Sequence, residues 1–273
     1  MPLFQLLDLR QKIGGGSGDI GNRSVERGLI GFGGCAKPAH FADELQSRRG
    51  NLVRRGGDFG SAKNFDTPAH STDYYAHVAE FLHQPVKPDG SGVVLTHGAG
   101  GNCTAPLLVA VAEALSAAGS VVLRYDLPYR VRRPFGPPSP ATAAADREGI
   151  RAAALRMRGM VSGPLILAGH SYGGRQSSML AAEEPDLADG LLLLSYPLHP
   201  PGRPGQLRTA HFPSLRIPAL FVSGVKDDFG SVEEMTAAVA LIPGKTRLVS
   251  IPGVGHDLGK GKVDLGKLAG GWR

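Results

Sequence analysis

The stretch that decides the fold is PLILAGHSYGGRQSSMLAA, residues 164–182. An apolar run of strand type passes through Gly169-His170-Ser171-Tyr172-Gly173-Gly174 into residues of helix type. A serine at such a strand-to-helix turn has a strained backbone, and only small neighbours leave it room. Its Oγ then points clear of the sheet, and the N–H of Tyr172 at the helix start can receive an oxyanion. Ser171 is therefore predicted to be a nucleophile.

Short apolar runs alternate with helical patterns on both sides of this turn. The predicted strands are 74–82, 93–97, 121–125, 164–168, 191–194, 217–223 and 247–251. The predicted helices are 104–115 and 142–158, capped by Thr104 and Thr142, then 172–182, 232–241 and the tail beyond 258. Strands that are apolar on both faces and separated by helices indicate an α/β fold. We expect a mostly parallel, doubly wound sheet of about six or seven strands, with helices on both faces.

A second candidate loop is His97-Gly98-Ala99-Gly100-Gly101, at the end of strand 93–97. Ligand sites of parallel sheets lie at the carboxyl ends of the strands, and glycines there let the backbone approach a ligand closely. Ala99 is the best candidate for a second oxyanion N–H, and His97 is a candidate substrate-binding residue. The alternative is a glycine-rich turn without chemistry.

Two further strand ends carry an acid and a base. Asp227 and Asp228 follow strand 217–223, and His256 follows strand 247–251. A serine becomes a good nucleophile when a histidine takes its proton, and a carboxylate fixes the tautomer of that histidine. The chain order Ser171, Asp227, His256 matches the order found in α/β-hydrolase active sites. Asp228 remains open as the acid, because one residue of register is not settled by spacing.

These motifs resemble those of the α/β-hydrolase superfamily. The chain looks most similar to a compact branch that includes dienelactone-hydrolase-like proteins and the testis-expressed and NSL-complex-subunit hydrolase-like proteins. The matching segments are 95–102, 123–129, 169–175, 196–202 and the loops of Asp227 and His256. The resemblance covers roughly residues 72–273, and the segment 196–202 is what suggests the narrower branch.

The resemblance implies a serine hydrolase with Ser171 as nucleophile, His256 as base and Asp227 as orienting acid. The expected reaction is cleavage of a carboxylic ester or thioester through an acyl-enzyme, without a cofactor or a metal. About 20 residues separate strands 191–194 and 217–223, so no large lid is expected there. Two alternatives stay open: a catalytically silent interaction protein of the same fold, and an acyltransferase that uses the same residues.

An arginine-rich loop lies near the same sheet edge. Residues 128–140 include Arg130, Arg132 and Arg133, with Arg124 just before, and these cations could bind an anionic group on the substrate. The alternative is a solvated loop stiffened by prolines.

Composition separates the chain into two parts. Residues 1–70 hold 13 glycines and ten Lys or Arg against seven Asp or Glu, without a sustained hydrophobic period. We predict a loose Gly/Arg-rich extension over 1–70 and a hydrolase domain over 71–273. The net charge of +6 is mild, so no nucleic-acid partner is expected.

The remaining sequence signals indicate a small-molecule acyl substrate as the partner. Two cysteines exclude a disulfide framework and a cysteine-rich zinc site. No run of about 18 apolar residues and no signal-peptide layout is present, so a cytoplasmic protein without a membrane span is expected. The oligomeric state is not readable from the sequence.

Overall fold

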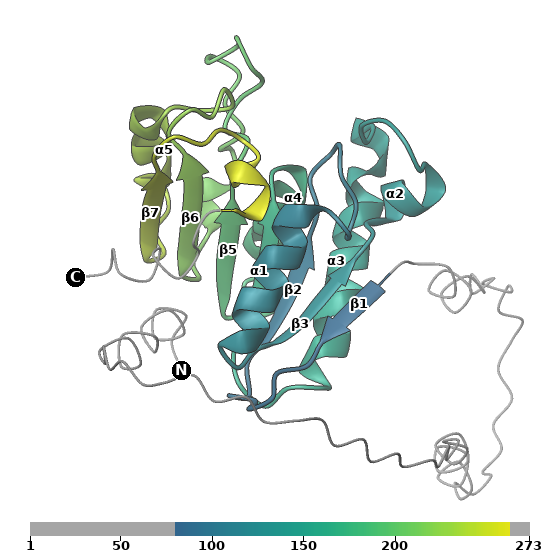
Figure 1. Ribbon diagram of the computed structural model, residues 1–273. Helices are drawn as coiled ribbons and strands as arrows, with labels where there is room; N and C mark the ends of the chain where they lie inside the picture. Colours follow the sequence, from purple (N-terminus) through teal and green to yellow (C-terminus); the bar gives the residue numbers. More distant parts are fainter. Residues whose placement is uncertain (1–79, 263–273) are drawn as a thin grey trace, which may run out of the picture. The chain divides into compact units, whose positions relative to one another are not determined.

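The computed structural model describes residues 80–262, which form a seven-stranded sheet with helices on both faces (Figure 1). The order across the sheet is β1-β3-β2-β4-β5-β6-β7. Only β1 runs antiparallel to its neighbour. The strands are β1 (Glu80–His83), β2 (Gly92–Thr96), β3 (Val121–Tyr125), β4 (Leu165–His170), β5 (Gly190–Leu194), β6 (Ala219–Gly224) and β7 (Thr246–Ile251). The prediction of a mostly parallel, doubly wound sheet is confirmed.

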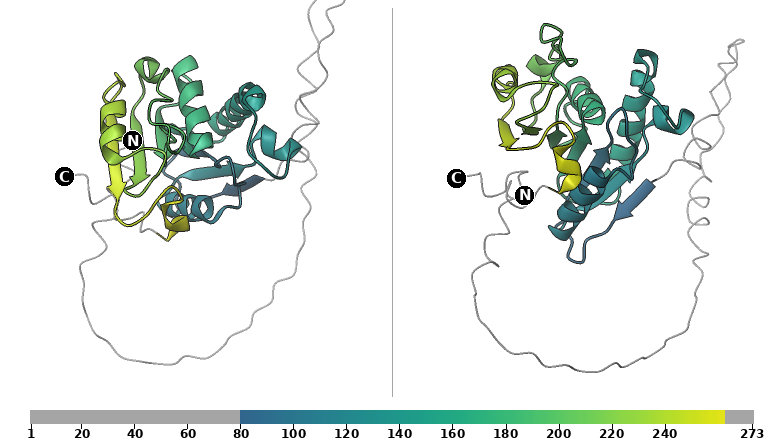
Figure 2. Two further views of the ribbon diagram at one scale, coloured as in Figure 1. Left: turned by 90° about the horizontal axis from the view of Figure 1, so that it is seen from above. Right: turned by 45° about the horizontal axis from the view of Figure 1, so that its top comes forward.

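The helices form a layer on each face of this sheet (Figure 2). The α-helices are α1 (Pro106–Ala117), α2 (Pro128–Arg132), α3 (Ala143–Arg158), α4 (Tyr172–Glu183) and α5 (Val232–Val239). Short 3₁₀ helices are η2 (Pro140–Thr142), η3 (Phe212–Ser214) and η4 (Leu258–Gly261). Helix α1 and η4 share a core with one face, and α3, α4 and α5 share a core with the other.

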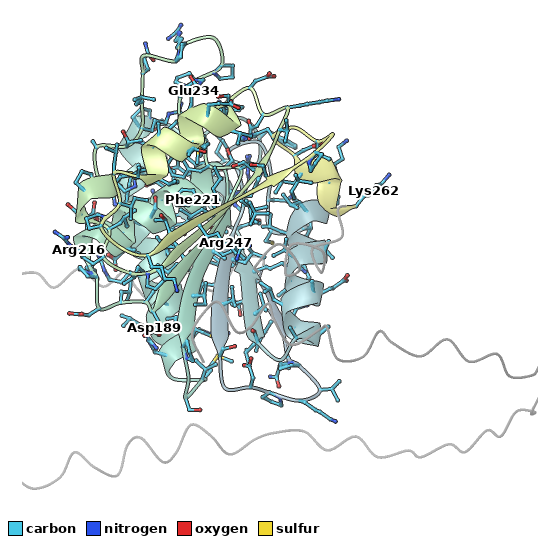
Figure 3. All side chains as sticks on the ribbon, turned by 90° about the vertical axis from the view of Figure 1, so that its left-hand side faces the viewer. Asp189, Arg216, Phe221, Glu234, Arg247 and Lys262 are labelled. Carbon is cyan, nitrogen blue, oxygen red and sulfur yellow. The ribbon has the colours of Figure 1, made fainter. Side chains whose placement is uncertain are left out.

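Alternation along each strand produces these two cores. In β2, Val93 packs with α1 while Val94 packs with α3 and α4. In β6, Phe221 belongs to the same cluster as Met235 of α5, and Figure 3 shows it in the layer beneath that helix. Successive side chains of a strand point to opposite faces, so a sheet covered on both faces needs the continuous apolar runs seen in the sequence.

Several predicted boundaries are corrected by the structure. Helix α1 begins at Pro106 after an Ala105 cap, because a proline suits the first turn; Thr104 instead bonds the Asn102 side chain. Thr142 holds the cap position of α3, but its hydroxyl donates to the Ser139 carbonyl and caps no helix N–H. The segment treated as a loop from residue 128 contains helix α2.

At the two ends, the predictions extend beyond the described residues. Strand β1 begins at Glu80, and the part of the predicted strand over 74–79 lies outside the described range, as does the extension over 1–70. The predicted final helix beyond residue 258 lies mostly outside the described range, whose last element is the 3₁₀ turn η4.

The sheet order places a switch point between β2 and β4. From β2 the chain adds β3 on one side, and then returns to add β4 on the other side. The loops that follow two such strands leave in opposite directions and open a crevice at their carboxyl ends. Ser171 follows β4 and Ala99 follows β2, so both lie at this crevice.

The segment between β5 and β6, residues 195–218, carries no large lid. Its one helix is the three-residue η3, and the whole segment lies in the described range. Among the helices described, none has the length and apolar character to cross a membrane.

Candidate active site

Ser171 occupies a strained turn between β4 and α4. Its backbone has φ 50° and ψ −116°, which side-chain-bearing residues rarely adopt. The turn is held from both sides, since the N–H of Ser171 donates to the Leu194 carbonyl at 2.8 Å and the N–H of Gly173 donates to the His97 carbonyl at 3.2 Å. The serine is 8% exposed, so a small part of it reaches the surface.

Glycines around Ser171 are required by close backbone contacts. A Cβ on Gly173 would lie 2.5 Å from the Thr96 hydroxyl and 2.6 Å from the His97 carbonyl oxygen. A Cβ on Gly169 would lie 2.4 Å from the backbone nitrogen of Gly174. Real Cβ atoms do not approach other atoms so closely, so the elbow can pack onto β2 only with glycine at these positions.

Three side chains meet in one hydrogen-bonded line at this edge of the sheet. His256 Nε2 lies 2.8 Å from Ser171 Oγ. His256 Nδ1 lies 2.9 Å from each carboxylate oxygen of Asp227. With Nδ1 donating to the carboxylate, Nε2 is free of its proton and can accept the hydroxyl proton of the serine.

The acid in this line is Asp227, and Asp228 is exposed. Asp227 is only 7% exposed, and its Oδ1 also accepts the N–H of Phe229 at 2.9 Å. The ring of Phe229 stacks on the ring of His256 with centroids 4.1 Å apart. The aspartate and the phenylalanine thus hold the imidazole in position from two sides.

Tyr172 and Ala99, whose N–H groups the sequence predicts as oxyanion donors, line the same cleft as Ser171. Tyr172 is the first residue of α4, where an N–H group has no acceptor within the helix. Ala99 lies in the loop after β2. An anion at this place would meet the positive end of α4 as well as these donors.

The loop of Ala99 is held by side chains from α2. Tyr129 Oη donates to the carbonyls of Gly98 at 3.1 Å and Ala99 at 3.0 Å. Arg130 is 6% exposed; its Nη2 donates to the Ala99 carbonyl at 2.8 Å and its Nε to the Gly101 carbonyl at 2.8 Å. Because the carbonyls are turned toward α2, the N–H groups of the loop are held in a fixed direction.

A buried carboxylate ties α4 to the same helix. Asp146 is fully buried, accepts the Tyr172 hydroxyl at 2.6 Å and accepts the N–H of Tyr129 at 2.8 Å. Burial, reinforced by this carboxylate, raises the pKa of the Tyr172 phenol, so the phenol remains a donor. Asp146 therefore links the starts of α2 and α4.

His97 does not reach the cleft. It is fully buried, its Nε2 accepts the N–H of Leu127 at 3.0 Å, and its Nδ1 lies 2.9 Å from the Gly98 carbonyl. Burial lowers its pKa, which matches a neutral ring with its proton on Nδ1. The structure thus gives His97 a positioning role between two loops and not the predicted contact with substrate.

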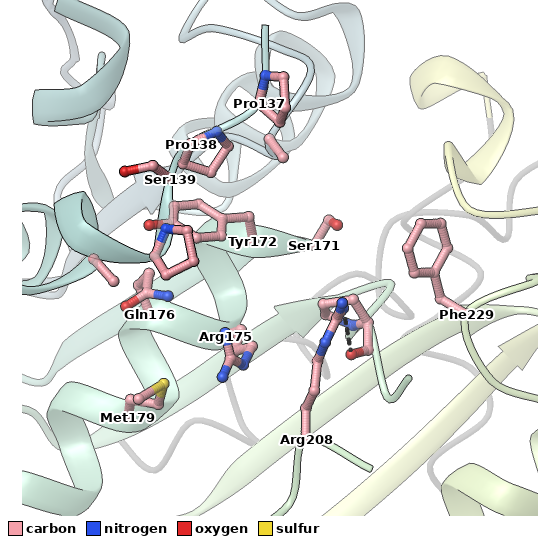
Figure 4. Close-up of a pocket in the computed structure, with 14 residues that line it drawn as sticks. Pro137, Pro138, Ser139, Ser171, Tyr172, Arg175, Gln176, Met179, Arg208 and Phe229 are labelled. Carbon is pink, nitrogen blue, oxygen red and sulfur yellow. Dashed lines mark hydrogen bonds between the residues drawn. The ribbon is translucent and has the colours of Figure 1, made fainter. Parts of the chain in front are cut away.

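A cleft of about 540 Å³ opens over Ser171 (Figure 4). Its lining includes prolines of the 137–140 segment, Met179 of α4, and Phe229. Arg132 and Arg133 are exposed and are not among the lining residues. The cations in the cleft are instead Arg175 and Arg208.

Sequence reasoning missed Arg175, Arg208 and Asp146. It named Arg130 only as one cation of an anion-binding loop and not as a support of the Ala99 loop. A signal existed for Arg175, because it follows Ser171 by four residues, and positions i and i+4 of a helix share a face. Arg208 lies in an irregular segment without periodicity, so no sequence pattern identified it. Over residues 80–262, no cluster of three or more His, Cys, Asp or Glu side chains is placed to hold a metal ion.

A second histidine beside the line gives a prediction about acid stability. The Nε2 of His170 bonds the backbone carbonyl of His256 at 2.8 Å, and burial lowers the pKa of His170 from 6.5 to about 4. As the pH falls from about 6.5 to about 4, the unfolded chain takes up this proton before the folded chain does. The free energy of unfolding should therefore fall over that window.

His170→Gln keeps an N–H donor and removes the titrating group, so its free energy of unfolding should change less between pH 7 and pH 5 than that of the parent protein. Urea unfolding at both pH values measures the difference. Equal changes in the two proteins would contradict a neutral, buried His170.

The chain is similar to a known family and to several solved structures. A model described as "Alpha/beta hydrolase domain" matches residues 89–267. An α/β serine hydrolase homologue from Coxiella burnetii is 19% identical, with a TM-score of 0.59 over 70% of this chain and 89% of that chain. Dienelactone hydrolase from Anabaena variabilis is 21% identical, with a TM-score of 0.53 over 71% and 90%.

A third similar structure is a lidless α/β serine hydrolase from Xanthomonas campestris, 20% identical, with a TM-score of 0.54 over 71% of this chain and 87% of that chain. At these identities the likeness concerns the fold. The family match confirms the α/β-hydrolase resemblance expected from the sequence, and the segment between β5 and β6 confirms that no large lid lies there.

Proposed function

This chain belongs to the alpha/beta hydrolase domain family, and on that premise we propose that it cleaves a carboxylic ester or thioester through an acyl-enzyme on Ser171. The observation that carries the proposal is the hydrogen-bonded line from Ser171 through His256 to Asp227. All three groups are chemically competent and within 2.9 Å of their partners, which favours catalysis over a silent relative of the fold.

The first half of the reaction forms the acyl-enzyme. Ser171 Oγ attacks the carbonyl carbon while His256 Nε2 takes the hydroxyl proton. The carbonyl oxygen becomes an oxyanion, which the N–H groups of Tyr172 and Ala99 stabilise. The tetrahedral intermediate then expels the alcohol or thiol, and His256 returns the proton to that leaving group.

The second half releases the acyl group. Water attacks the acyl carbon, His256 takes its proton, and Ser171 leaves with that proton as the carboxylic acid departs. Asp227 stays ionised and stabilises the cationic imidazole in both halves. An acyltransferase would differ only in the acceptor, so added alcohols distinguish the two through the products formed.

Labelling with a fluorophosphonate tests the proposal directly. An activated serine forms a covalent phosphonate ester, so the folded protein is expected to label near one equivalent, with the adduct on the peptide of Ser171. Mass spectrometry of the intact protein and of its peptides measures both quantities. Heat-denatured protein is the control, because separated side chains do not activate the serine. Absence of label in folded protein would refute the enzyme and leave an interaction protein.

A further inference from the structure

Two guanidinium groups face the cleft in which Ser171 lies. Arg175 projects from the first turn of α4, and Arg208 projects from the segment between β5 and β6 (Figure 4). They come from parts of the chain 33 residues apart in the printed sequence. The fold alone brings them to the same side of the cleft, where the charge of Arg175 acts on Arg208.

The protein does not neutralise this pair within the described range. None of the ion pairs over residues 80–262 includes Arg175 or Arg208. The Nε of Arg175 is buried and has no hydrogen-bond acceptor among the described residues. Arg208 Nη1 donates to the Pro197 carbonyl at 3.2 Å, which fixes its direction without cancelling its charge.

The groups packed nearby are neutral. His211 Nε2 lies 2.8 Å from Ser178 Oγ, and burial, followed by the charge of Arg175, lowers the pKa of His211 to about 4. Tyr196 Oη donates to the Arg208 carbonyl at 2.6 Å, and burial raises the pKa of this phenol. Burial, followed by repulsion from Arg175, lowers the pKa of Arg208 itself. A bound anion would offset the repulsion between these two cations and stabilise both.

Most of the remaining lining is apolar, with Ser139 and Gln176 as polar exceptions. Pro137, Pro138, Pro140, Ala143 and Met179 also line the cleft. The volume of about 540 Å³ is in the range that holds a small molecule. The cleft thus offers an apolar surface and a cationic one beside the same serine, as an acyl chain with a charged end would require.

We propose that Arg175 and Arg208 form an anion subsite that binds a carboxylate or phosphate carried by the substrate. Guanidinium groups bind both anions through charge-assisted, bidentate hydrogen bonds. The inference rests on the proposed esterase chemistry and adds a substrate class to it: esters that carry a negative charge. It replaces the predicted role of Arg132 and Arg133, which lie outside the cleft.

The experiment compares two esters with acyl chains of six carbons, monoethyl adipate and ethyl hexanoate, on the full-length protein. The parent protein is expected to have the higher kcat/KM for the adipate ester. Arg175→Gln and Arg208→Gln should each lower the adipate-to-hexanoate ratio of kcat/KM about tenfold or more, mainly through KM, because each removes a charged hydrogen-bond donor. Arg175→Lys keeps the positive charge but cannot form the bidentate hydrogen bonds of a guanidinium group. It should give an adipate-to-hexanoate ratio between those of the parent protein and Arg175→Gln.

Arg216→Gln is the matched control. Arg216 is exposed and precedes β6, so it lies at the amino-terminal end of that strand, whereas Ser171 lies at the carboxyl ends of the strands. The ratio should stay unchanged in Arg216→Gln, and equally in Arg132→Gln and Arg133→Gln. A parent protein that prefers the neutral ester, or a ratio that does not fall in the Arg175 and Arg208 variants, overturns the subsite.

A binding measurement separates this inference from the esterase proposal. Calorimetry on the full-length Ser171→Ala protein should detect adipate, inorganic phosphate or both, and the binding should be lost when Arg175→Gln or Arg208→Gln is added. The anion that binds identifies the group on the substrate. Binding without hydrolysis of either ester would refute the esterase and keep the subsite. Hydrolysis of both esters at equal kcat/KM, without binding of adipate or phosphate, would refute the subsite and keep the esterase.

Discussion

Replacing Ser171 with alanine is expected to lower kcat/KM for ester hydrolysis by about 10⁴- to 10⁶-fold. The hydroxyl that His256 Nε2 approaches at 2.8 Å is the only group the substitution removes. Without it no acyl-enzyme forms, while the cleft and the oxyanion donors remain. The measurement is steady-state hydrolysis of a neutral ester by both proteins. Equal far-UV circular dichroism spectra would show that the variant folds.

A glycine at the same position serves as a second variant with a different signature. Because Ser171 has φ 50° and ψ −116°, a residue without Cβ relieves strain that costs on the order of 1–3 kcal/mol. Ser171→Gly should therefore be as inactive as Ser171→Ala, yet more resistant to urea than Ser171→Ala by about 1 kcal/mol. Retained hydrolysis in either variant would place the nucleophile elsewhere.

Replacing Asp227 with asparagine is expected to lower kcat by about 10⁴-fold with little change in KM. The amide can still accept the N–H of Phe229 through its oxygen, and it then turns its NH₂ toward His256 Nδ1. That contact forces the proton of the neutral imidazole onto Nε2, where it faces Ser171. An imidazole in this tautomer does not accept the proton of the serine.

Asp228→Asn is the control for this change. Asp228 is the next residue in the chain and carries the same charge, but it is exposed. Its kcat should remain within about twofold of the parent value, because surface charges in water act weakly at a distance. The steady-state kinetics of the two variants settle the role of each aspartate, and the reverse pattern would make Asp228 the acid.

Much of the fold was predictable because its determinants are local. An apolar run such as that of β4 indicates a buried parallel strand wherever it occurs, and the glycines at 169 and 173 mark a turn that tolerates no Cβ. Helix starts were less predictable. Thr104 is a good capping residue, but Pro106 two positions later decided where α1 begins.

The candidate site also has a part that local sequence predicts and a part that it does not. The positions of Ser171, His256 and an acid at three strand ends follow from chain order in a parallel sheet. The choice between Asp227 and Asp228 does not, because adjacent residues after a strand point in different directions and only the packed loop shows which one meets His256.

Only the tertiary structure decided which arginines are buried and which line the cleft. By itself the sequence determined the elbow, the alternation of strands and helices, and the order of nucleophile, acid and base. It could not distinguish Arg130, buried against backbone carbonyls, from exposed Arg132, because the two lie two residues apart and have identical side chains. Nor could it bring Arg208 to Arg175. The burial of Arg130 and the approach of Arg208 to Arg175 depend on segments that meet only on folding, so no local pattern of the sequence encodes them.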